Sequence, residues 1–383
     1  MPLSMPQWPA VAARFGKVAR VTRAARIGSN SDDVRRRNLS GVLTLVHRHR
    51  ALSRAELTRR TGLSRSTVKD LVEELAALGL VAEVQAATAT QVGRPSPIVC
   101  PQAKTLCVAV NPEIDGITVG LVGLGGLVLE TLHFPTDVVP TAEAAVATAA
   151  GAVELLRSKL EPGCRIVAIG AAVPGLVYGG SAVRLAPHLE WHDADFGHML
   201  TVATGLPVFA ANDANAGAIA EHLFGRHHNA DHMIYVNGGA GGIGAGFVVA
   251  GELLHGLAGY AGELGHTYVG GDGQCHCGNI GCLETQVRQT GTAVERQARY
   301  LAIALGNAVN MLNPGLIVLG GFLRVFPELA GEVLSAEMAR HSLRAAHELV
   351  RVVPATLGAE TLMIGAAELA FAPVLDNPAA VSA

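Results

Sequence analysis

Hydrophobic residues recur in two different patterns along the chain. Between residues 38 and 80, apolar positions lie three or four residues apart, which is typical of amphipathic helices. From residue 105 onward, short runs rich in Val, Ile and Ala end in glycine turns and alternate with helical stretches. The sequence therefore predicts a small helical domain followed by an α/β body. Because 383 residues exceed one ordinary core and only 16% are charged, we expect more than one well-buried domain.

The helical front has the spacing of a helix-turn-helix. One helix is predicted over Asn38–Arg50, a second over residues 54–61, and a third after Ser64, whose side chain suits the N-cap position. Gly62 stops the second helix, so only a short turn separates it from the third. Residues 80–99 then predict two strands, which is typical of a wing. The front is therefore predicted to be a winged helix-turn-helix.

The charge distribution indicates that this front binds a polyanion. Residues 1–100 hold sixteen Lys or Arg against seven Asp or Glu, whereas the remaining residues hold thirteen against twenty-five. A basic front on an acidic body favours DNA as the partner. The alternatives are that the basic residues only aid solubility, or that the helices form a protein-interaction module. The residues expected to contact DNA phosphates and base edges are Arg54, Ser64, Arg65, Ser66, Thr67, Lys69 and, in the wing, Arg94.

These patterns divide the chain into three parts. Residues 1–33 are expected to be a flexible basic tail, residues 34–100 the winged helix-turn-helix, and residues 101–383 the body. Residues 301–323 carry no charge, but the asparagines, proline and glycines among them favour a buried helix, a turn and a strand over a membrane span. No apolar signal segment precedes the six cysteines. We therefore predict a cytoplasmic protein without membrane contact.

Three of the six cysteines, Cys275, Cys277 and Cys282, lie within eight residues in a glycine-rich stretch. Zinc takes four ligands in a tetrahedron, commonly thiolates and imidazole. His266 and His276 compete to be the fourth ligand. A residue between two ligating cysteines usually points away from the metal that they share, which favours His266. Four protein ligands leave no position for water, so the predicted zinc is structural.

The body resembles the ROK family (repressors, open reading frames and kinases) over roughly residues 38–370. The motifs that carry the resemblance are, in chain order, AVPGLV, ANDANAGAIAEH, GGAGGIGAG, GYAGELGHTYV, CHCGNIGCLE and NPGLIVLGG. The resemblance implies a two-lobed, actin-like and ribonuclease-H-like fold, and the same four zinc ligands. It also implies a sugar site, in which carboxylates accept hydrogen bonds from hydroxyls. The implied sugar-binding residues are Gly175, Asn212, Asp213, Glu263, His266 and Glu284.

The resemblance leaves a choice between kinase and regulator. The family's kinases hold ATP phosphates with an Asp-x-Gly-x-Thr turn, but Asn111 stands where that aspartate should be. Asp115–Thr118 reads D-G-x-T at a different spacing, and Ala240 replaces the threonine of the second phosphate loop. In the kinases, the aspartate matching Asp213 is the general base, and asparagine usually stands at the position of His188. Alternatively, Asn212 or Asp213 only caps a helix.

We therefore predict a non-catalytic, sugar-responsive transcriptional regulator, most simply a repressor. Its partners would be operator DNA and a sugar or sugar phosphate, and it would act as a homodimer or homotetramer. The alternative is an ATP-dependent sugar kinase with an accessory DNA-binding head, in which Asp213 would be catalytic. A ligand-free interaction protein is the third reading, and the complete set of sugar-binding residues argues against it.

Overall fold

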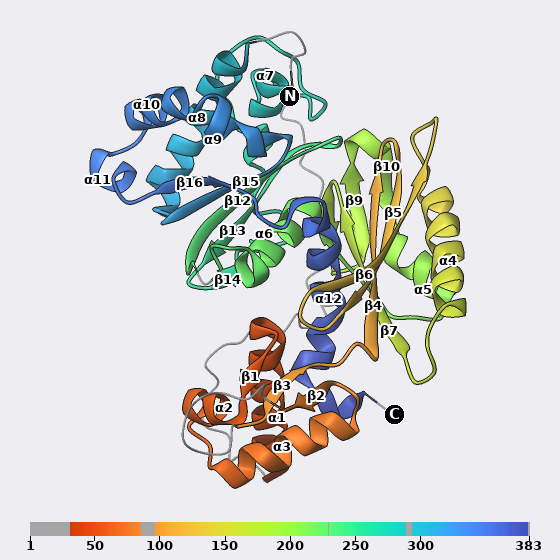
Figure 1. Ribbon diagram of the computed structural model, residues 1–383. Coiled ribbons are helices and arrows are strands. Elements are labelled where there is room, and N and C mark those ends of the chain that lie inside the picture. The colour runs from red at the N-terminus through yellow and green to blue at the C-terminus, as the bar shows by residue number, and fades with distance from the viewer. Residues whose placement is uncertain (1–30, 86–95, 229, 289–292, 382–383) are drawn as a thin grey trace, which may run out of the picture.

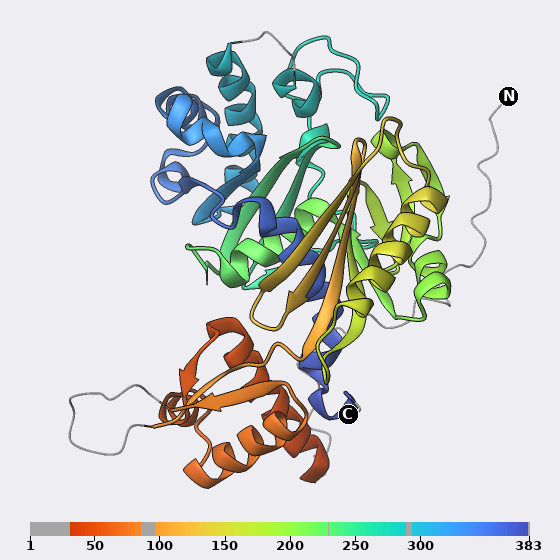
Figure 2. The same ribbon diagram turned by 45° about the vertical axis from the view of Figure 1, so that its right-hand side comes forward.

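The computed structural model describes residues 31–85, 96–228, 230–288 and 293–381. These residues form a small head and two larger lobes, and a long helix runs from between the lobes to the head (Figure 1). The head lies at one end of the body, next to this helix, in the second view as well (Figure 2).

The head contains three helices and a three-stranded antiparallel sheet in the order β1-β3-β2. Its elements are α1 (Ser31–His49), β1 (Leu52–Ser53), α2 (Arg54–Thr61), α3 (Arg65–Ala77), β2 (Val81–Val84) and β3 (Ile98–Pro101). Helix α2 ends at Gly62, which has a φ of 71°, and α3 begins after Ser64, whose side chain accepts a hydrogen bond from the Thr67 N–H. The fold class, a winged helix-turn-helix before a two-lobed body, is thereby confirmed.

Two details of the head differ from the sequence prediction. Helix α1 begins at Ser31, so residues 31–33 are helical and not part of a flexible tail. Asp32 and Asp33 lie in its first turn, where negative charge stabilises the helix dipole. Strand β1 is an additional short strand. Arg94, predicted at the wing, lies outside the described residues.

Lobe 1 is built on a five-stranded mixed sheet in the order β11-β7-β4-β5-β6. Its strands are β4 (Thr105–Glu113), β5 (Gly116–Gly123), β6 (Leu127–Pro135), β7 (Arg165–Val173) and β11 (Val208–Asn212). Alternate residues of β4 serve opposite faces: Leu106 and Val108 join one hydrophobic core with α4 (Ala142–Ser158) and α5 (Phe196–Thr204), and Cys107 and Ala109 join another. A small antiparallel sheet completes the lobe, with β8 (Leu176–Tyr178), β9 (Ala182–Ala186) and β10 (Trp191–Ala194).

Lobe 2 repeats the sheet topology of lobe 1. Its order is β14-β13-β12-β15-β16, with antiparallel pairing of the first three strands and parallel pairing of the last three. The strands are β12 (His232–Gly239), β13 (Gly242–Val249), β14 (Glu252–Leu253), β15 (Leu316–Gly321) and β16 (Arg351–Pro354). Its helices are α7 (Leu283–Val287), α8 (Val294–Leu312), α9 (Phe326–Leu329), α10 (Gly331–His341) and α11 (Arg344–His347). Short 3-10 turns complete the fold, namely η1 (Pro187–Leu189), η2 (Leu264–His266), η3 (Phe322–Val325), η4 (Gly358–Glu360) and η5 (Pro378–Ala380).

Helices α6 (Asp213–Phe224) and α12 (Thr361–Asp376) form a central helix pair between the lobes. Glycines allow their backbones to approach closely: a Cβ at Gly365 would lie 2.0 Å from the Ala216 carbonyl oxygen. In the same way, a Cβ at Gly170 on β7 would lie 1.7 Å from the Ala366 carbonyl oxygen. Any side chain at either position would push the pair apart.

Among the described residues, one helical segment, Gly358–Asp376, is long and apolar enough to cross a membrane, judged by its length and composition alone. It contains α12, and 56% of it is buried inside the protein, as expected for a core helix. The uncharged segment at residues 301–323 contains the end of α8, a turn and strand β15, as the sequence predicts.

Candidate functional site

The predicted sugar-binding residues begin where α6 starts, between the two lobes. The Asn212 Oδ1 accepts hydrogen bonds from the N–H groups of Ala214 (2.9 Å) and Asn215 (3.2 Å). Its Nδ2 donates to the Gly175 carbonyl at 3.1 Å. Asn212 therefore caps α6, the alternative raised from sequence, and also ties the helix to the loop that carries Gly175.

Asp213 joins the two lobes at the same point. Its Oδ1 accepts from the Ala214 N–H at 2.9 Å, and its Oδ2 accepts from Asn237 Nδ2 at 3.1 Å. Asn237 lies near the end of β12 in lobe 2 and is 4% exposed. Burial raises the pKa of Asp213 to about 6, and these hydrogen bonds offset part of that rise. Sequence reasoning missed Asn237, for which the only signal is its position before Gly238 at the end of a strand.

One ring nitrogen of His266 faces Glu263, a predicted sugar-binding residue, and the other ring nitrogen faces the cysteines. Its Nε2 lies 3.9 Å from Glu263 Oε2, and its Nδ1 lies 3.5 Å from Cys275 Sγ. The short η2 turn holds Glu263 and His266 three residues apart on one side of the chain. The ring therefore links the Cys cluster to the carboxylate of Glu263.

Glu284, at the start of α7, is held by two hydrogen bonds. His188 Nε2 lies 3.1 Å from its Oε1, and the Ile243 N–H donates to its Oε2 at 2.9 Å. Burial would raise the pKa of Glu284, but the hydrogen bonds from His188 and Ile243 outweigh it and the pKa is lowered. His188 comes from lobe 1 and Glu284 from lobe 2, so this contact also spans the lobes.

The three carboxylates are close enough to interact through their charges. The pKa of Glu263 is raised to about 7, mainly by burial and then by the nearby carboxylates of Asp213 and Glu284. The site is therefore rich in hydrogen-bond acceptors and poor in positive charge. A ligand with several hydroxyl donors suits such a surface.

Four side chains form a cluster that could hold a metal. The ligand atoms of His266, Cys275, Cys277 and Cys282 all lie within 4.8 Å of one another. A zinc ion with bonds of about 2.3 Å to sulfur and about 2.0 Å to nitrogen requires S···S edges of about 3.8 Å and S···N edges of about 3.5 Å. The distances are 3.7 Å between Cys277 Sγ and Cys282 Sγ, and 3.5 Å between Cys275 Sγ and His266 Nδ1. The cluster thus fits zinc.

His276 lies away from this cluster. Its ring packs edge-on against His188, with 4.7 Å between centroids. Among the described residues, the metal-capable group includes His266 and not His276, as the rule on alternating residues predicts. His276 therefore connects the cysteine-containing loop to His188, which contacts Glu284.

The turns that hold phosphate in kinases differ here. Asn111 on β4 is 3% exposed, and its Oδ1 has no hydrogen-bond partner among the described residues. The carboxyl of Glu113 follows, and its pKa is raised by burial and by the charges of Asp213 and Asp115. Thr118 lies within strand β5, and its Oγ1 is 3.1 Å from His133 Nδ1 on β6, so it is part of the sheet and not of a turn. Glu113, which sequence reasoning missed, thus adds an acidic group beside Asn111, whereas nucleotide phosphates are held by positively charged groups.

The second glycine loop carries Ala240 between β12 and β13. Its carbonyl accepts a hydrogen bond from Arg288 at 2.9 Å. Alanine has no hydroxyl to offer to a phosphate. Arg288 therefore anchors the loop, and at Ala240 only the backbone N–H could donate a hydrogen bond to a phosphate.

The predicted DNA-contacting residues differ in their availability. Ser64, Ser66 and Thr67 form a hydroxyl cluster at the start of α3, with oxygen–oxygen distances of 2.8 to 2.9 Å. Arg65 is exposed there. Lys69 pairs with Glu73 one turn later at 3.6 Å, an exposed contact that DNA can replace.

Arg54 is more constrained than the sequence suggests. It forms ion pairs with Glu83 on β2 and with Glu73 on α3, and its side chain is 22% exposed. These pairs join α2 to the wing strand and to α3. Arg54 is therefore held in place by protein carboxylates, and would reach DNA only by breaking them.

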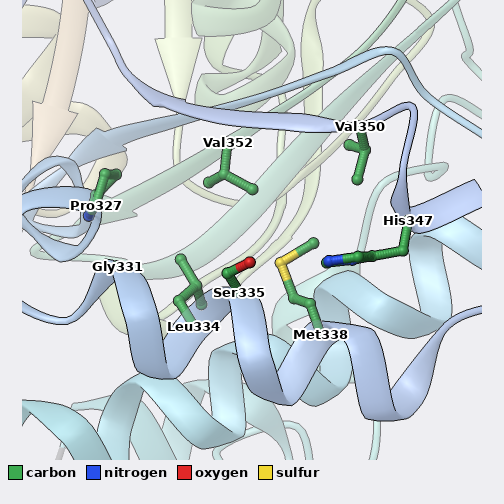
Figure 3. Close-up of a pocket in the computed structure, with 8 residues that line it drawn as sticks. All are labelled: Pro327, Gly331, Leu334, Ser335, Met338, His347, Val350 and Val352. Atoms are coloured by element: carbon green, nitrogen blue, oxygen red, sulfur yellow. The ribbon is translucent and has the colours of Figure 1, made fainter. Parts of the chain in front are cut away.

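A separate cavity of about 300 Å³ lies in lobe 2 between α10 and β16 (Figure 3). Leu334, Met338 and Val352 line it, together with Ser335 and His347, and the ring of His347 points toward Met338. None of the predicted sugar-binding residues lines this cavity.

The fold and the site define a class: a two-lobed, sugar-kinase-like body that carries a DNA-binding head. The chain belongs to the ROK family, which it matches over residues 107–291 and 286–372. Residues 41–85 match the IclR helix-turn-helix domain.

Several regulators are similar to this chain, two of them over nearly its whole length. The putative xylose repressor of Caldicellulosiruptor sp. (strain Rt8B.4) is 27% identical and aligns over 88% of this chain and 96% of its own. The xylose repressor of Bacillus subtilis (strain 168) is 25% identical over 90% of this chain and 97% of its own. The DNA-binding transcriptional dual regulator NagC of Escherichia coli (strain K12) is 30% identical over 68% of this chain and 64% of its own.

Solved structures of both regulators and kinases share the fold. A ROK family transcriptional regulator, a homologue of the E. coli MLC protein, has a TM-score of 0.73 and 25% identity, covering 90% of this chain and 97% of its own. The ROK hexokinase from Thermus thermophilus has a TM-score of 0.60 and 31% identity, covering 71% of this chain and 100% of its own. The regulator thus covers more of this chain than the kinase does.

We expect Cys277→Ser to release the metal, because a hydroxyl is a much poorer zinc ligand than a thiolate. Metal analysis of purified protein should show zinc falling from about one ion per chain to a small fraction of that. The variant should also unfold at a lower temperature, since ligand binding contributes to folding. Cys164→Ser, at a half-buried thiol that bonds to the Ala103 carbonyl, is the matched control. Equal zinc in both variants would remove the assignment.

Proposed function

We propose that this protein is a sugar-responsive DNA-binding repressor whose effector binds between the two lobes. The observation that carries the proposal is the group formed by Asn212, Asp213, Glu263 and Glu284 in a chain that also carries a helix-turn-helix. The similarity to a putative xylose repressor over 88% of the chain, and to NagC over 68% of it, supports the proposal. The domain boundaries that we propose are residues 31–100 for the head, which includes the first turn of α1, and residues 101–383 for the body.

We propose further that the body does not transfer phosphate. Phosphoryl transfer needs groups that neutralise the triphosphate and its metal. Asn111 replaces an acidic metal-binding group, Ala240 lacks a hydroxyl, and Glu113 adds a negative charge that would repel phosphates. The alternative, a sugar kinase with a DNA-binding head, rests on the kinase structures that share the body fold.

The Cys/His cluster is proposed to hold a structural zinc ion. Zinc would be bound by all four side chains. It would fix the His266 ring, so that Nε2 presents its N–H toward the proposed sugar site. Metal binding would thereby shape the pocket without joining any chemistry. We also propose that the protein works in the cytoplasm as a homodimer or homotetramer, because operators are usually read by symmetric pairs of heads.

Sugar binding would favour one closure of the lobes over another. A ligand shifts such an equilibrium only by its difference in affinity for the two states. Here Asn212 joins the Gly175 loop of lobe 1 to α6, whereas Asp213 bonds to Asn237 of lobe 2. A sugar that replaces or bridges these contacts acts on both lobes at once.

A thermal-shift screen of pentoses, hexoses, amino sugars and their phosphates, each with and without Mg-ATP, tests the proposal. A sugar present at about a thousand times its dissociation constant should stabilise the protein by about 4 kcal/mol. We expect a free sugar to raise the melting temperature, and Mg-ATP to add nothing. Turnover of ATP with the same sugar would establish the kinase alternative instead.

Sugar affinity should fall below about pH 6, because Asp213 has its pKa raised to about 6 by burial. A sugar hydroxyl donates to the ionised carboxylate, so protonation competes with binding, and affinity should drop roughly tenfold per pH unit below that pKa. Calorimetric titration between pH 5 and pH 8 measures this slope. In Asp213→Asn binding should be weaker and the dependence on pH smaller, with only the contribution of Glu263, whose pKa is raised to about 7, remaining. Exposed Asp137→Asn should behave like the wild type. An unchanged dependence on pH in Asp213→Asn would assign it to another group.

Arg65→Ala should weaken DNA binding by about 1 to 3 kcal/mol, since Arg65 is exposed at the end of α3 that enters the groove. Fluorescence anisotropy with a duplex selected by the wild-type protein measures the loss. The sugar-induced thermal shift should be unchanged. Arg59→Ala removes an exposed arginine that pairs with Glu56 on α2, and serves as the matched control. Equal losses in both variants would contradict the placement of α3 in the groove.

A further inference from the structure

We propose that helix α6 transmits sugar occupancy to the DNA-binding head, where His47 and Arg50 respond to it through Phe224. This inference rests on the proposed sugar response and adds the route by which it reaches DNA. The two ends of α6 carry the argument. Asn212 and Asp213 begin the helix at the sugar site, and Phe224 ends it at the head.

Phe224 touches the head directly. Its ring packs edge-on against the His47 ring with 5.3 Å between centroids, and the Arg50 guanidinium lies 5.3 Å from the centre of the same ring. His47 lies in the last turn of α1, and Arg50 follows its end. The twelve residues of α6 span about 18 Å, so a tilt at the sugar end displaces Phe224 at the other.

The helix is packed too tightly to absorb such a displacement. A Cβ at Gly217 would lie 2.3 Å from the Tyr235 ring, and one at Gly246 of β13 would lie 2.5 Å from the Ala218 side chain. Ala214, Ala216, Ala218 and Ala220 are all fully buried. Close-packed elements of this kind move as rigid bodies and do not deform.

His47 is held by a buried hydrogen-bond network at the boundary between the head and the body. Its Nδ1 accepts a hydrogen bond from the Gly125 N–H at 2.9 Å, so the ring carries its proton on Nε2. Nε2 then donates to Glu368 Oε2 on α12 at 2.8 Å. The side chains of His47 and Glu368 are only 1% and 4% exposed, and Glu368 Oε1 has no hydrogen-bond partner among the described residues. One head residue is thus bonded to both lobe 1 and the central helix pair.

Arg50 adds a strained hinge at the same place. Its φ is 61°, a left-handed conformation that is costly for a residue with a side chain. The Arg50 Nε donates to the Gly125 carbonyl at 2.8 Å, which holds it there together with the Phe224 ring. Movement of Phe224 would remove part of this restraint.

Helix α1 can pass the change on to the DNA-reading helix. Leu39, Val42 and Val46 of α1 share one buried core with Val68 and Leu71 of α3. Arg35 of α1 also forms an ion pair with Glu74 of α3. A reorientation of α1 relative to the body therefore moves α3 with it.

The test compares DNA affinity with and without saturating sugar in the wild type and in Phe224→Leu. The probes are D-xylose, or the sugar that stabilises the wild type in the screen, and the duplex selected by the wild-type protein. Allosteric coupling commonly changes affinity by about 5- to 150-fold. We expect Phe224→Leu to keep sugar affinity and sugar-free DNA affinity within about twofold while the sugar effect on DNA binding shrinks to about twofold or less.

Phe326→Leu, the same change at a buried phenylalanine in the lobe 2 core, should retain the full sugar effect. Glu368→Gln keeps an acceptor for His47 Nε2 and should retain the effect, whereas Glu368→Ala should lose it. Hydrogen exchange of residues 31–50 gives a second readout: sugar should change it in the wild type but not in Phe224→Leu.

A full sugar effect in Phe224→Leu, or an equal loss of sugar-free DNA binding in Phe224→Leu and Phe326→Leu, would overturn the inference. Equal behaviour of Glu368→Gln and Glu368→Ala would show that the buried network holds the head in place without coupling it, and would also overturn it. If sugar binds the wild type but leaves its DNA affinity unchanged, the proposed function fails instead. The two failures are therefore distinguishable.

Discussion

The close contact between the backbones of α6 and α12 is the constraint on which the remaining structure depends. It exists because Gly365 and Gly170 carry no side chains where α12 crosses α6 and strand β7. Core residues of the head, of lobe 1 and of α12 belong to one hydrophobic cluster, which includes Ala216 of α6, and Ala218 of the same helix joins a core of lobe 2. An arrangement of this kind cannot change at one end without changing at the other.

Packing around α6 also determines how far the carboxylates of the proposed ligand site are shielded from water. Residues 214–218 of α6 are buried, and Asp213 at its start is half-buried beside them, so its carboxylate loses much of the water that would favour its charged form. Glu263 loses water in the same way, and the charges of Asp213 and Glu284 raise its pKa further. A polyhydroxyl ligand relieves this by donating hydrogen bonds, whereas a phosphate would add negative charge to the same space.

Much of this could be predicted from sequence, where chemistry depends on local spacing. The helix-turn-helix needs only Gly62 and Ser64 at the right distance, and the His266 assignment follows from alternation around His276. Contacts between distant segments left no such local signal. Asn237 meets Asp213, and His47 meets Glu368, across 24 and 321 residues respectively. Arg54 is a residue for which sequence reasoning predicted a DNA contact that the structure makes harder. Its guanidinium forms ion pairs with Glu73 and Glu83, which come from other elements and could not be recognised as its partners from sequence.

The residues that differ from the kinase pattern bear on how the two lobes would close. In a kinase, lobe closure is driven by sugar and nucleotide together, because both ligands span the lobes. In the proposed function, Asn111, Glu113 and Ala240 offer little to a nucleotide, so the sugar side would supply the contacts that distinguish open from closed lobes. The free energy of closure would then depend on one ligand, which is what a sensor of that ligand requires. The residues that are proposed to disfavour phosphate binding would thereby make lobe closure, and with it the position of α6, depend on the sugar alone.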